Sequence, residues 1–202
     1  MYKAYIKRGL DIVLAFFGIC FFALPMAFIA LVIKLDDRGP VLFSQQRVGK
    51  NKQLFNMYKF RTMKTAAPKD CPTHLLRDPQ MYITKVGRFL RRSSLDELPQ
   101  LFNILLGHMS VVGPRPALWN QQDLIAERDR FGANALHPGL TGWAQINGRD
   151  ELPVEQKAAL DGEYAEKIGF LFDCRCFFGT FLAVVSARGV REGSVDKKDG
   201  QK

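Results

Sequence analysis

The sequence has few of the residues that build metal clusters or covalent cross-links. Its 202 residues include four cysteines and three histidines. The cysteines form no Cys-x-x-Cys pair. Cys174 and Cys176 are two positions apart, which is poor spacing for a zinc finger, and no histidine pair accompanies them. The composition therefore excludes a recognisable zinc module and favours reduced thiols in a cytosolic compartment.

Acidic residues are also scarce relative to basic ones. The chain has 29 Lys and Arg against 20 Asp and Glu, a net charge of +9, which suits an anionic partner such as lipid head groups, a diphosphate or nucleic acid. Helix-turn-helix, RNA-recognition, Walker and Rossmann signatures are all missing. We therefore expect no nucleic-acid partner, and the non-enzymatic alternative is a basic membrane-anchored scaffold or nucleic-acid binder.

Charge is missing altogether from residues 12–33. As a helix this run would be roughly 33 Å long, enough to cross the hydrocarbon core of a bilayer. Pro25 lies near its middle, where it bends a helix. Basic residues flank both ends, and such flanks mark the cytoplasmic side. We therefore predict that residues 1–38 form a re-entrant membrane helix, with a spanning helix containing one proline as the alternative.

The rest of the chain predicts an α+β domain that is predominantly helical. Residues 41–63 read as a small β element. Amphipathic or apolar helices are expected around 81–106 and 163–188, packed at or beside the membrane interface. We expect residues 39–190 to form a cytoplasmic catalytic domain on the membrane surface, and residues 191–202 to form a flexible tail.

Two segments offer contacts to phosphate. Lys59 and Arg61 alternate with aromatic residues, so both cations would lie on one side of a strand, as a phosphate-facing edge or as an ordinary solvated face. Gly139 and Gly142 belong to a glycine-containing loop, 137–150, where the backbone could approach a ligand closely. The loop matches no standard nucleotide motif, so its signal is weak by itself.

The densest chemistry lies in the stretch RRSSLDELPQ, which holds Asp96 next to Glu97. Ser94 and Glu97 have the spacing of a capping box, and Pro99 is compatible with a first helical turn. Carboxylates there are stabilised in the ionised form by the helix dipole. Neighbouring helical residues point about 100° apart, so the two carboxylates would differ in role. The alternative is that both are merely N-terminal helix charges.

Taken together, five motifs make the chain similar to a known family. It resembles the bacterial sugar transferases, the monotopic phosphoglycosyl transferases, and its length resembles the minimal members. The resemblance covers nearly all of residues 5–190. The motifs, in chain order, are KRGLDIVLA, GPVLFSQQRVG, FNMYKFRTM, SLDELPQLFNILLGHMSVVGPRP and HPGLTGWAQINGRD.

The resemblance implies transfer of a sugar 1-phosphate from a UDP-sugar to undecaprenyl phosphate, with release of UMP and a requirement for Mg²⁺. It implies that Asp96 is the nucleophile that carries the phospho-sugar covalently, and that Glu97 binds the metal or positions the nucleophile. Which carboxylate holds the metal stays open. The family breaks its re-entrant helix at a Ser-Pro pair, whereas this chain has Leu24 before Pro25.

The resemblance also implies where cations and partners lie. Substrate phosphates would meet a set of basic residues: Lys59, Arg61, Arg88, Arg115 and Arg149. Lys7 and Arg8 would flank the membrane hairpin, although Arg8 and Asp11 also have the spacing of a structural i,i+3 pair.

The expected location is the cytoplasmic face of the bacterial inner membrane, among inner-leaflet phospholipids and downstream glycosyltransferases. The transferred sugar, the glycan pathway and the oligomeric state are not specified by the sequence. A metal-dependent phosphohydrolase using the same two carboxylates is the enzymatic alternative.

Overall fold

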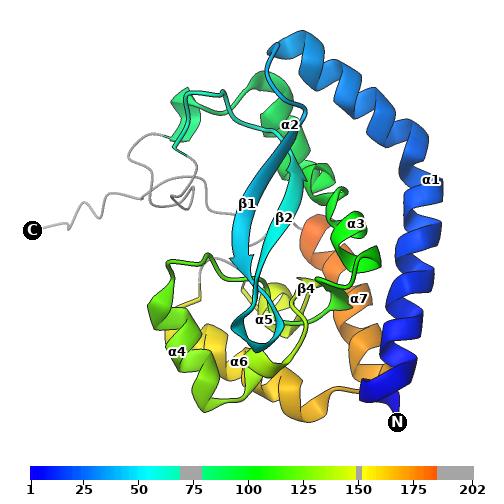
Figure 1. The fold of residues 1–202 in the computed structure, drawn as a ribbon, viewed down its shortest axis with the longest axis vertical. Helices are drawn as coiled ribbons and strands as arrows, with labels where there is room; N and C mark the ends of the chain where they lie inside the picture. The colour runs from blue at the N-terminus through cyan, green and yellow to red at the C-terminus, as the bar shows by residue number, and fades with distance from the viewer. Residues whose placement is uncertain (69–78, 149–151, 186–202) are drawn as a thin grey trace, which may run out of the picture.

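The computed structural model describes residues 1–68, 79–148 and 152–185. The architecture is mostly helical with two small two-stranded sheets, which confirms the α+β expectation (Figure 1). The helices are α1 (Lys7–Asp36), α2 (Lys85–Ser93), α3 (Gln100–Leu105), α4 (Gln122–Arg130), α5 (Trp143–Ile146), α6 (Val154–Lys167) and α7 (Phe170–Val185). The strands are β1 (Leu42–Val48), β2 (Leu54–Phe60), β3 (Ser110–Val112) and β4 (Gly139–Thr141). Short helical turns are η1 (Tyr2–Ile6), η2 (Lys50–Lys52), η4 (Pro79–Met81), η5 (Leu95–Glu97) and η6 (Ala133–Ala135).

Helix α1 runs along one edge of the molecule and leaves most of its surface uncovered (Figure 1). One stripe packs on the domain, and its buried members are Asp11, Ala15, Ile29 and Ile33. The other faces expose large apolar side chains: Ile12, Val13, Leu14, Phe16, Phe17, Phe21, Leu24, Phe28, Leu31 and Leu35. Among the described residues, α1 is the helix whose length and apolar composition would suffice to cross a membrane. Its geometry in a membrane, hairpin or span, stays a prediction.

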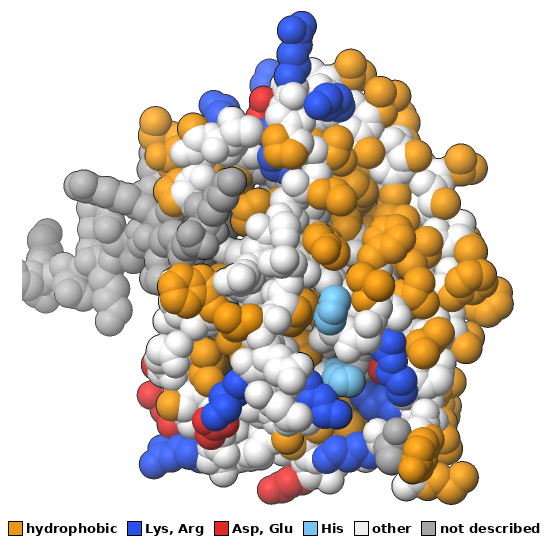
Figure 2. Space-filling model, in the orientation of Figure 1, with side chains coloured by type: hydrophobic (Ala, Val, Ile, Leu, Met, Phe, Trp, Pro, Cys, Tyr) orange, Lys and Arg blue, Asp and Glu red, His pale blue; other side chains and the backbone are white. Residues whose placement is uncertain are grey.

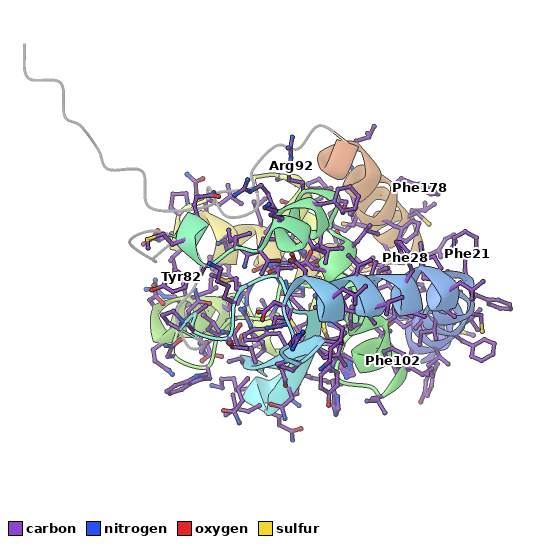
Figure 3. All side chains as sticks on the ribbon, turned by 90° about the horizontal axis from the view of Figure 1, so that it is seen from above. Phe21, Phe28, Tyr82, Arg92, Phe102 and Phe178 are labelled. Carbon is purple, nitrogen blue, oxygen red and sulfur yellow. The ribbon has the colours of Figure 1, made fainter. Side chains whose placement is uncertain are left out.

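The exposed apolar surface extends beyond α1. Figure 2 shows apolar side chains along the α1 edge and over the neighbouring part of the molecule. In Figure 3, Phe102 of α3 and Phe178 of α7 lie on either side of α1, which carries Phe21 and Phe28. Phe102 is 43% exposed and Phe178 is 65% exposed. Three helices thus expose large apolar side chains, and their position at a membrane interface stays a prediction.

The predicted β element is an antiparallel hairpin. β1 pairs with β2 in a register that sets Leu42 opposite Phe60 and Val48 opposite Leu54. Alternate β2 side chains, among them Phe55 and Met57, are buried in the main core. In Figure 1, one end of the hairpin lies near α2 and the other lies near α4 and α5.

A second, parallel pair, β3 with β4, was not predicted from the sequence. It brings Gly113 against Gly139, where a Cβ on Gly139 would lie 2.1 Å from the Gly113 nitrogen. A Cβ on Gly142 would lie 2.0 Å from the Gly113 oxygen. These glycines therefore let two backbone segments touch. Their small size is explained by this packing rather than by open space for a ligand.

The capping-box interpretation of Ser94 and Glu97 is wrong. Ser94 has a left-handed backbone, φ 56°, and ends α2 as well as preceding the next helical turn. Its side chain caps nothing, and Leu95–Glu97 forms a short 3-10 turn before α3. The cap in this region belongs to Thr84, whose hydroxyl oxygen accepts a hydrogen bond of 2.9 Å from the Gly87 amide. A capping pattern read from spacing cannot tell which of two adjacent helices it serves.

Candidate active site

The two adjacent carboxylates sit on the turn η5, between the end of α2 and the start of α3. The left-handed Ser94 ends α2, and the turn leads from it toward α3. Asp96 is 8% exposed and is thus held inside the protein. A carboxylate in a solvated helix cap would be open to water, so the reading of both groups as ordinary helix-end charges does not fit this burial.

Glu97 lies between two cations. Its Oε1 accepts a hydrogen bond of 2.6 Å from Lys59 Nζ of β2 and one of 2.8 Å from Arg115 Nη2, in the loop after β3. Burial alone would raise the pKa of Glu97, but the Arg115 and Lys59 charges outweigh it and hold that pKa well below its usual range. Glu97 is therefore ionised at neutral pH and links three separate elements.

Asp96 has a different environment. Among the described residues, its carboxylate takes part in no hydrogen bond or ion pair of its own. Burial raises the pKa of Asp96, and the neighbouring Glu97 charge raises it further, whereas Lys59, Arg91 and Arg115 lower it. The two carboxylates thus differ in environment, and their difference in role stays a prediction. Glu97 has one oxygen, Oε1, bound by two protein cations, and Asp96 lies near the same cations with its oxygens uncommitted.

A buried asparagine fixes the distance between strand and helix at this site. Asn103 of α3 is fully buried. Its Oδ1 accepts a 2.9 Å hydrogen bond from the Tyr58 amide, and its Nδ2 donates one of 2.8 Å to the Asn56 carbonyl oxygen. This pairing holds β2, and with it Lys59, against the helix that follows the dyad. Sequence reasoning missed Asn103, although an asparagine inside an apolar helix was a signal of a buried polar partner.

The loop that carries Arg115 is also anchored. Arg47 of β1 donates a 3.1 Å hydrogen bond to the Pro116 carbonyl oxygen. The Val48 amide donates one of 2.9 Å to the Ala117 carbonyl oxygen. Flanking prolines restrict the backbone of Arg115 further. Its guanidinium therefore reaches Glu97 from a stiff segment, and its side chain is 34% exposed.

Arg91 is the α2 cation whose charge acts on Asp96. Its Nε donates a 2.8 Å hydrogen bond to Thr62 Oγ1, and its charge lowers the pKa of Asp96. Gly87 makes this approach possible, because a Cβ there would lie 2.0 Å from the Thr62 carbonyl oxygen. The sequence prediction chose Arg88 instead, which is exposed and donates a long hydrogen bond of 3.4 Å to Gln80 Oε1.

The remaining predicted site residues lie elsewhere or outside the described residues. Arg61 is 6% exposed, and its guanidinium donates two hydrogen bonds of 2.6 Å to Asp37, one to Oδ2 and one to the carbonyl oxygen. It thus ties the end of α1 to the strand. Arg149 lies outside the described residues. Roles for Arg61, Arg88 and Arg149 in substrate binding stay predictions.

The basic residues at the start of α1 bind the domain. Lys7 Nζ lies 2.7 Å from Asp173 Oδ2 of α7. Arg8 donates hydrogen bonds to the carbonyl oxygens of Ile104, at 2.7 Å, and Leu105, at 3.2 Å, which close the end of α3. Asp11 Oδ1 accepts a hydrogen bond of 2.9 Å from the Val111 amide. In the described contacts, Lys7, Arg8 and Asp11 thus each bind a different part of the domain, and the expected Arg8–Asp11 pair is not formed.

A resident metal cage is not formed by the described residues, among which no group of three or more His, Cys, Asp or Glu converges. This donor set still fits Mg²⁺, which usually binds one or two carboxylates and takes its other ligands from substrate phosphates and water. Asp96 and Glu97 are the two adjacent carboxylates at the site. A metal held there would depend on the substrate for most of its coordination.

The comparisons with known proteins agree on one group. A family model described as "Bacterial sugar transferase" matches residues 2–187. The uncharacterized sugar transferase EpsL of Bacillus subtilis is 38% identical over 187 residues, 93% of this chain and 91% of EpsL. The undecaprenyl-phosphate glucose phosphotransferase of Komagataeibacter xylinus is 40% identical over 202 residues, 90% of this chain and 36% of that protein.

A third relative differs in the sugar that its name gives. The UDP-N-acetylgalactosamine-undecaprenyl-phosphate N-acetylgalactosaminephosphotransferase of Aeromonas hydrophila is 35% identical over 196 residues, 93% of this chain and 45% of that protein. The chain thus spans nearly all of EpsL but less than half the length of the two named phosphotransferases.

Proposed function

The chain belongs to the bacterial sugar transferase family, and we propose that it moves a sugar 1-phosphate from a UDP-sugar to undecaprenyl phosphate with release of UMP. Relatives are named as undecaprenyl-phosphate sugar phosphotransferases, so it is a transferase of that class. Their names give glucose in one case and N-acetylgalactosamine in another, so family membership leaves the sugar open. The product would begin a glycan that downstream glycosyltransferases extend.

The observation that carries the mechanism is the contrast between the two carboxylates. Glu97 holds Lys59 and Arg115 in place, while Asp96 beside them has uncommitted oxygens. A diphosphate would bring negative charge to those cations, and a carboxylate can attack it only where such charge is offset. We propose that Asp96 is the nucleophile and that Lys59, Arg91 and Arg115 stabilise the charge on the reacting phosphate.

The proposed reaction has two balanced steps. A carboxylate oxygen of Asp96 attacks the β-phosphorus of the UDP-sugar, and the bond from that phosphorus to the bridging oxygen breaks, so UMP leaves with the electron pair. An oxygen of undecaprenyl phosphate then attacks the same phosphorus. The bond to Asp96 breaks, which regenerates the carboxylate and yields the lipid diphosphate sugar. Mg²⁺, when bound with the substrate phosphates at Asp96 and Glu97, would supply further charge neutralisation.

A lipid acceptor requires the site to lie at a membrane. The exposed apolar side chains of α1, α3 and α7 support this position, because soluble proteins rarely expose such a surface. We propose that the chain lies on the cytoplasmic face of the inner membrane, held by α1 as a re-entrant helix bent at Pro25. Cysteine labelling of residues 3 and 38 tests this. Labelling of both from the cytoplasmic side is expected, and labelling from opposite sides would establish a span.

The test of function is UMP release from a panel of UDP-sugars by the full chain in nanodiscs with Mg²⁺, with and without undecaprenyl phosphate. With a correct donor we expect sustained release only when lipid is present. Without lipid we expect a single equivalent of UMP and a sugar-phosphate mass increase on the peptide containing Asp96. Sustained release without lipid would instead establish a hydrolase, and UMP release unchanged in Asp96→Asn would remove the nucleophile from this mechanism.

A further inference from the structure

Helix α2 carries cations on two different sides. Arg91 faces inward, toward Thr62 and the dyad. Three other cations, Lys85, Arg88 and Arg92, are exposed and follow each other at intervals of three and four residues. That spacing places them on one face of a helix. We call this face, together with Phe89 and Ser93, the outer α2 stripe.

The outer α2 stripe is a groove with a mixed lining. Lys85, Arg88, Phe89, Arg92 and Ser93 line a hollow of about 440 Å³. Phe89 is 64% exposed and gives the groove an apolar wall among the cations. Figure 3 shows Arg92 standing out from α2. Within the part of the chain that the structure describes, Lys85 and Arg92 have no carboxylate partner. Positive charge thus remains available to a ligand.

The groove is separated from the membrane anchor by α2, a width of about 10–12 Å. On the opposite face of α2, Leu90 is buried in a cluster with Ile29 and Ile33 of α1. The same half of α1 exposes Phe28 and Leu31. A phosphate held by the stripe could therefore belong to a lipid whose chain stays in the bilayer next to α1. The uracil and sugar of a nucleotide sugar would find no carboxylate or amide acceptor among these lining residues, and the Ser93 hydroxyl already donates to the Phe89 carbonyl oxygen.

We propose that the outer α2 stripe binds the phosphate monoester head group of the polyprenyl phosphate acceptor before it reaches the dyad. This inference rests on the proposed function. A phosphate monoester carries between one and two negative charges near neutral pH, more than the diester of a phospholipid such as phosphatidylglycerol, and three cations in one groove match it better. Ser94 alone separates α2 from the turn that bears Asp96. The C-terminal end of the stripe is therefore the end nearest the dyad, and an acceptor bound there would be close to Asp96.

The experiment separates the two half reactions in nanodiscs of phosphatidylcholine. The variant is Arg88→Gln with Arg92→Gln, and its control is Lys50→Gln with Lys52→Gln, which removes the same charge from exposed positions in η2. We expect the stripe variant to form the full single equivalent of sugar-phosphate adduct, and to raise the KM for undecaprenyl phosphate about tenfold or more. The control should leave both unchanged, and Arg88→Lys with Arg92→Lys should restore most of the loss.

Each other outcome decides a different question. An unchanged KM in the stripe variant overturns the inference and leaves the proposed function intact. Reduced adduct formation in that variant means that the stripe serves the donor, which also overturns it. Added phosphatidylglycerol that raises the wild-type KM to the variant's value means that the groove binds bulk anionic lipid instead. Absence of adduct in the wild type for every UDP-sugar would reject the proposed function itself.

Discussion

Two buried aspartates, Asp96 on η5 and Asp161 on α6, differ in how their charge is balanced. Asp161 is 1% exposed, and Arg128 of α4 approaches its Oδ2 at 2.6 and 2.8 Å. Asp96 is 8% exposed, and its nearby cations are bound to its neighbour Glu97 instead. Burial raises the pKa of both aspartates, and cations oppose the rise in both. Asp161 has an ion-pair partner of its own, whereas Asp96 has cations nearby without, among the described residues, an ion pair to any of them.

The difference separates a structural charge from a functional one. The Arg128–Asp161 pair joins α4 to α6 with each charge satisfied by the other, so a ligand would find nothing to bind. At the dyad, two cations serve one glutamate, and Asp96 keeps its oxygens available. A buried carboxylate without its own partner destabilises the folded chain, and such a cost persists at sites where the group is used.

The largest effect should come from Asp96→Asn. We expect adduct formation and turnover to fall by about 10³-fold or more, since the amide cannot act as the nucleophile. Folded Asp96, with its raised pKa, keeps its proton at a pH where the unfolded chain has lost it, so stability falls as the pH rises from the unfolded pKa to the folded pKa. The variant should thus have an unchanged or higher Tm at pH 7. A lower Tm would mean that Asp96 also holds the fold together.

The reverse result is expected for Asp161→Asn. It leaves Arg128 buried without its countercharge, which costs about 3–5 kcal/mol and lowers the Tm by roughly 10 °C. Turnover per folded molecule should not change. The control replaces both members, Arg128→Met with Asp161→Leu, and should recover most of the stability because no lone charge remains. If the double variant is as unstable as the single one, the pair contributes more than mutual compensation.

A smaller effect is expected for Lys59→Met, which removes one of the cations around the dyad. Turnover should fall about 10²-fold, the usual loss for one charge-stabilising donor. The pH profile makes the test specific. Lys59 lowers the pKa of Asp96, so its removal raises that pKa. The acid limb, which is the low-pH side of the pH–rate profile of adduct formation, should therefore move to higher pH. A loss of rate with an unmoved acid limb would assign Lys59 to substrate binding alone.

The sequence predicted this site unevenly, for physical reasons. Adjacent Asp96 and Glu97 stood out because charged pairs followed by an apolar helix are informative without coordinates. Lys59 and Arg115 were found because their motifs resemble those of the family. Arg91 and Asn103 were missed. Choosing Arg91 over Arg88 requires the phase of α2 relative to the domain, which tertiary packing sets.

The fold was predicted to a similar depth. The apolar run of α1 and the alternating hairpin have strong periodic signals, and both elements are present. The β3–β4 pair has three residues in each strand and depends on contact between Gly113 and Gly139, far apart in the sequence. No local pattern encodes such a contact. The left-handed Ser94 was also hidden, since serine rarely adopts that conformation and its usual role at a helix end is the N-cap.

The smallest effect should come from Lys52→Met, which tests whether an ion pair alone makes a site. Lys52 Nζ lies 2.9 Å from Asp129 Oδ2, about as close as the pair at Glu97, but both side chains are about half exposed. Water screens such a pair, so its loss should cost about 0.2–1 kcal/mol and leave turnover and the acid limb unchanged. Lys52 and Lys59 carry the same charge and contact the same type of group. If their variants differ as expected, the burial of the dyad, and not the presence of an ion pair, gives Lys59 its effect on catalysis.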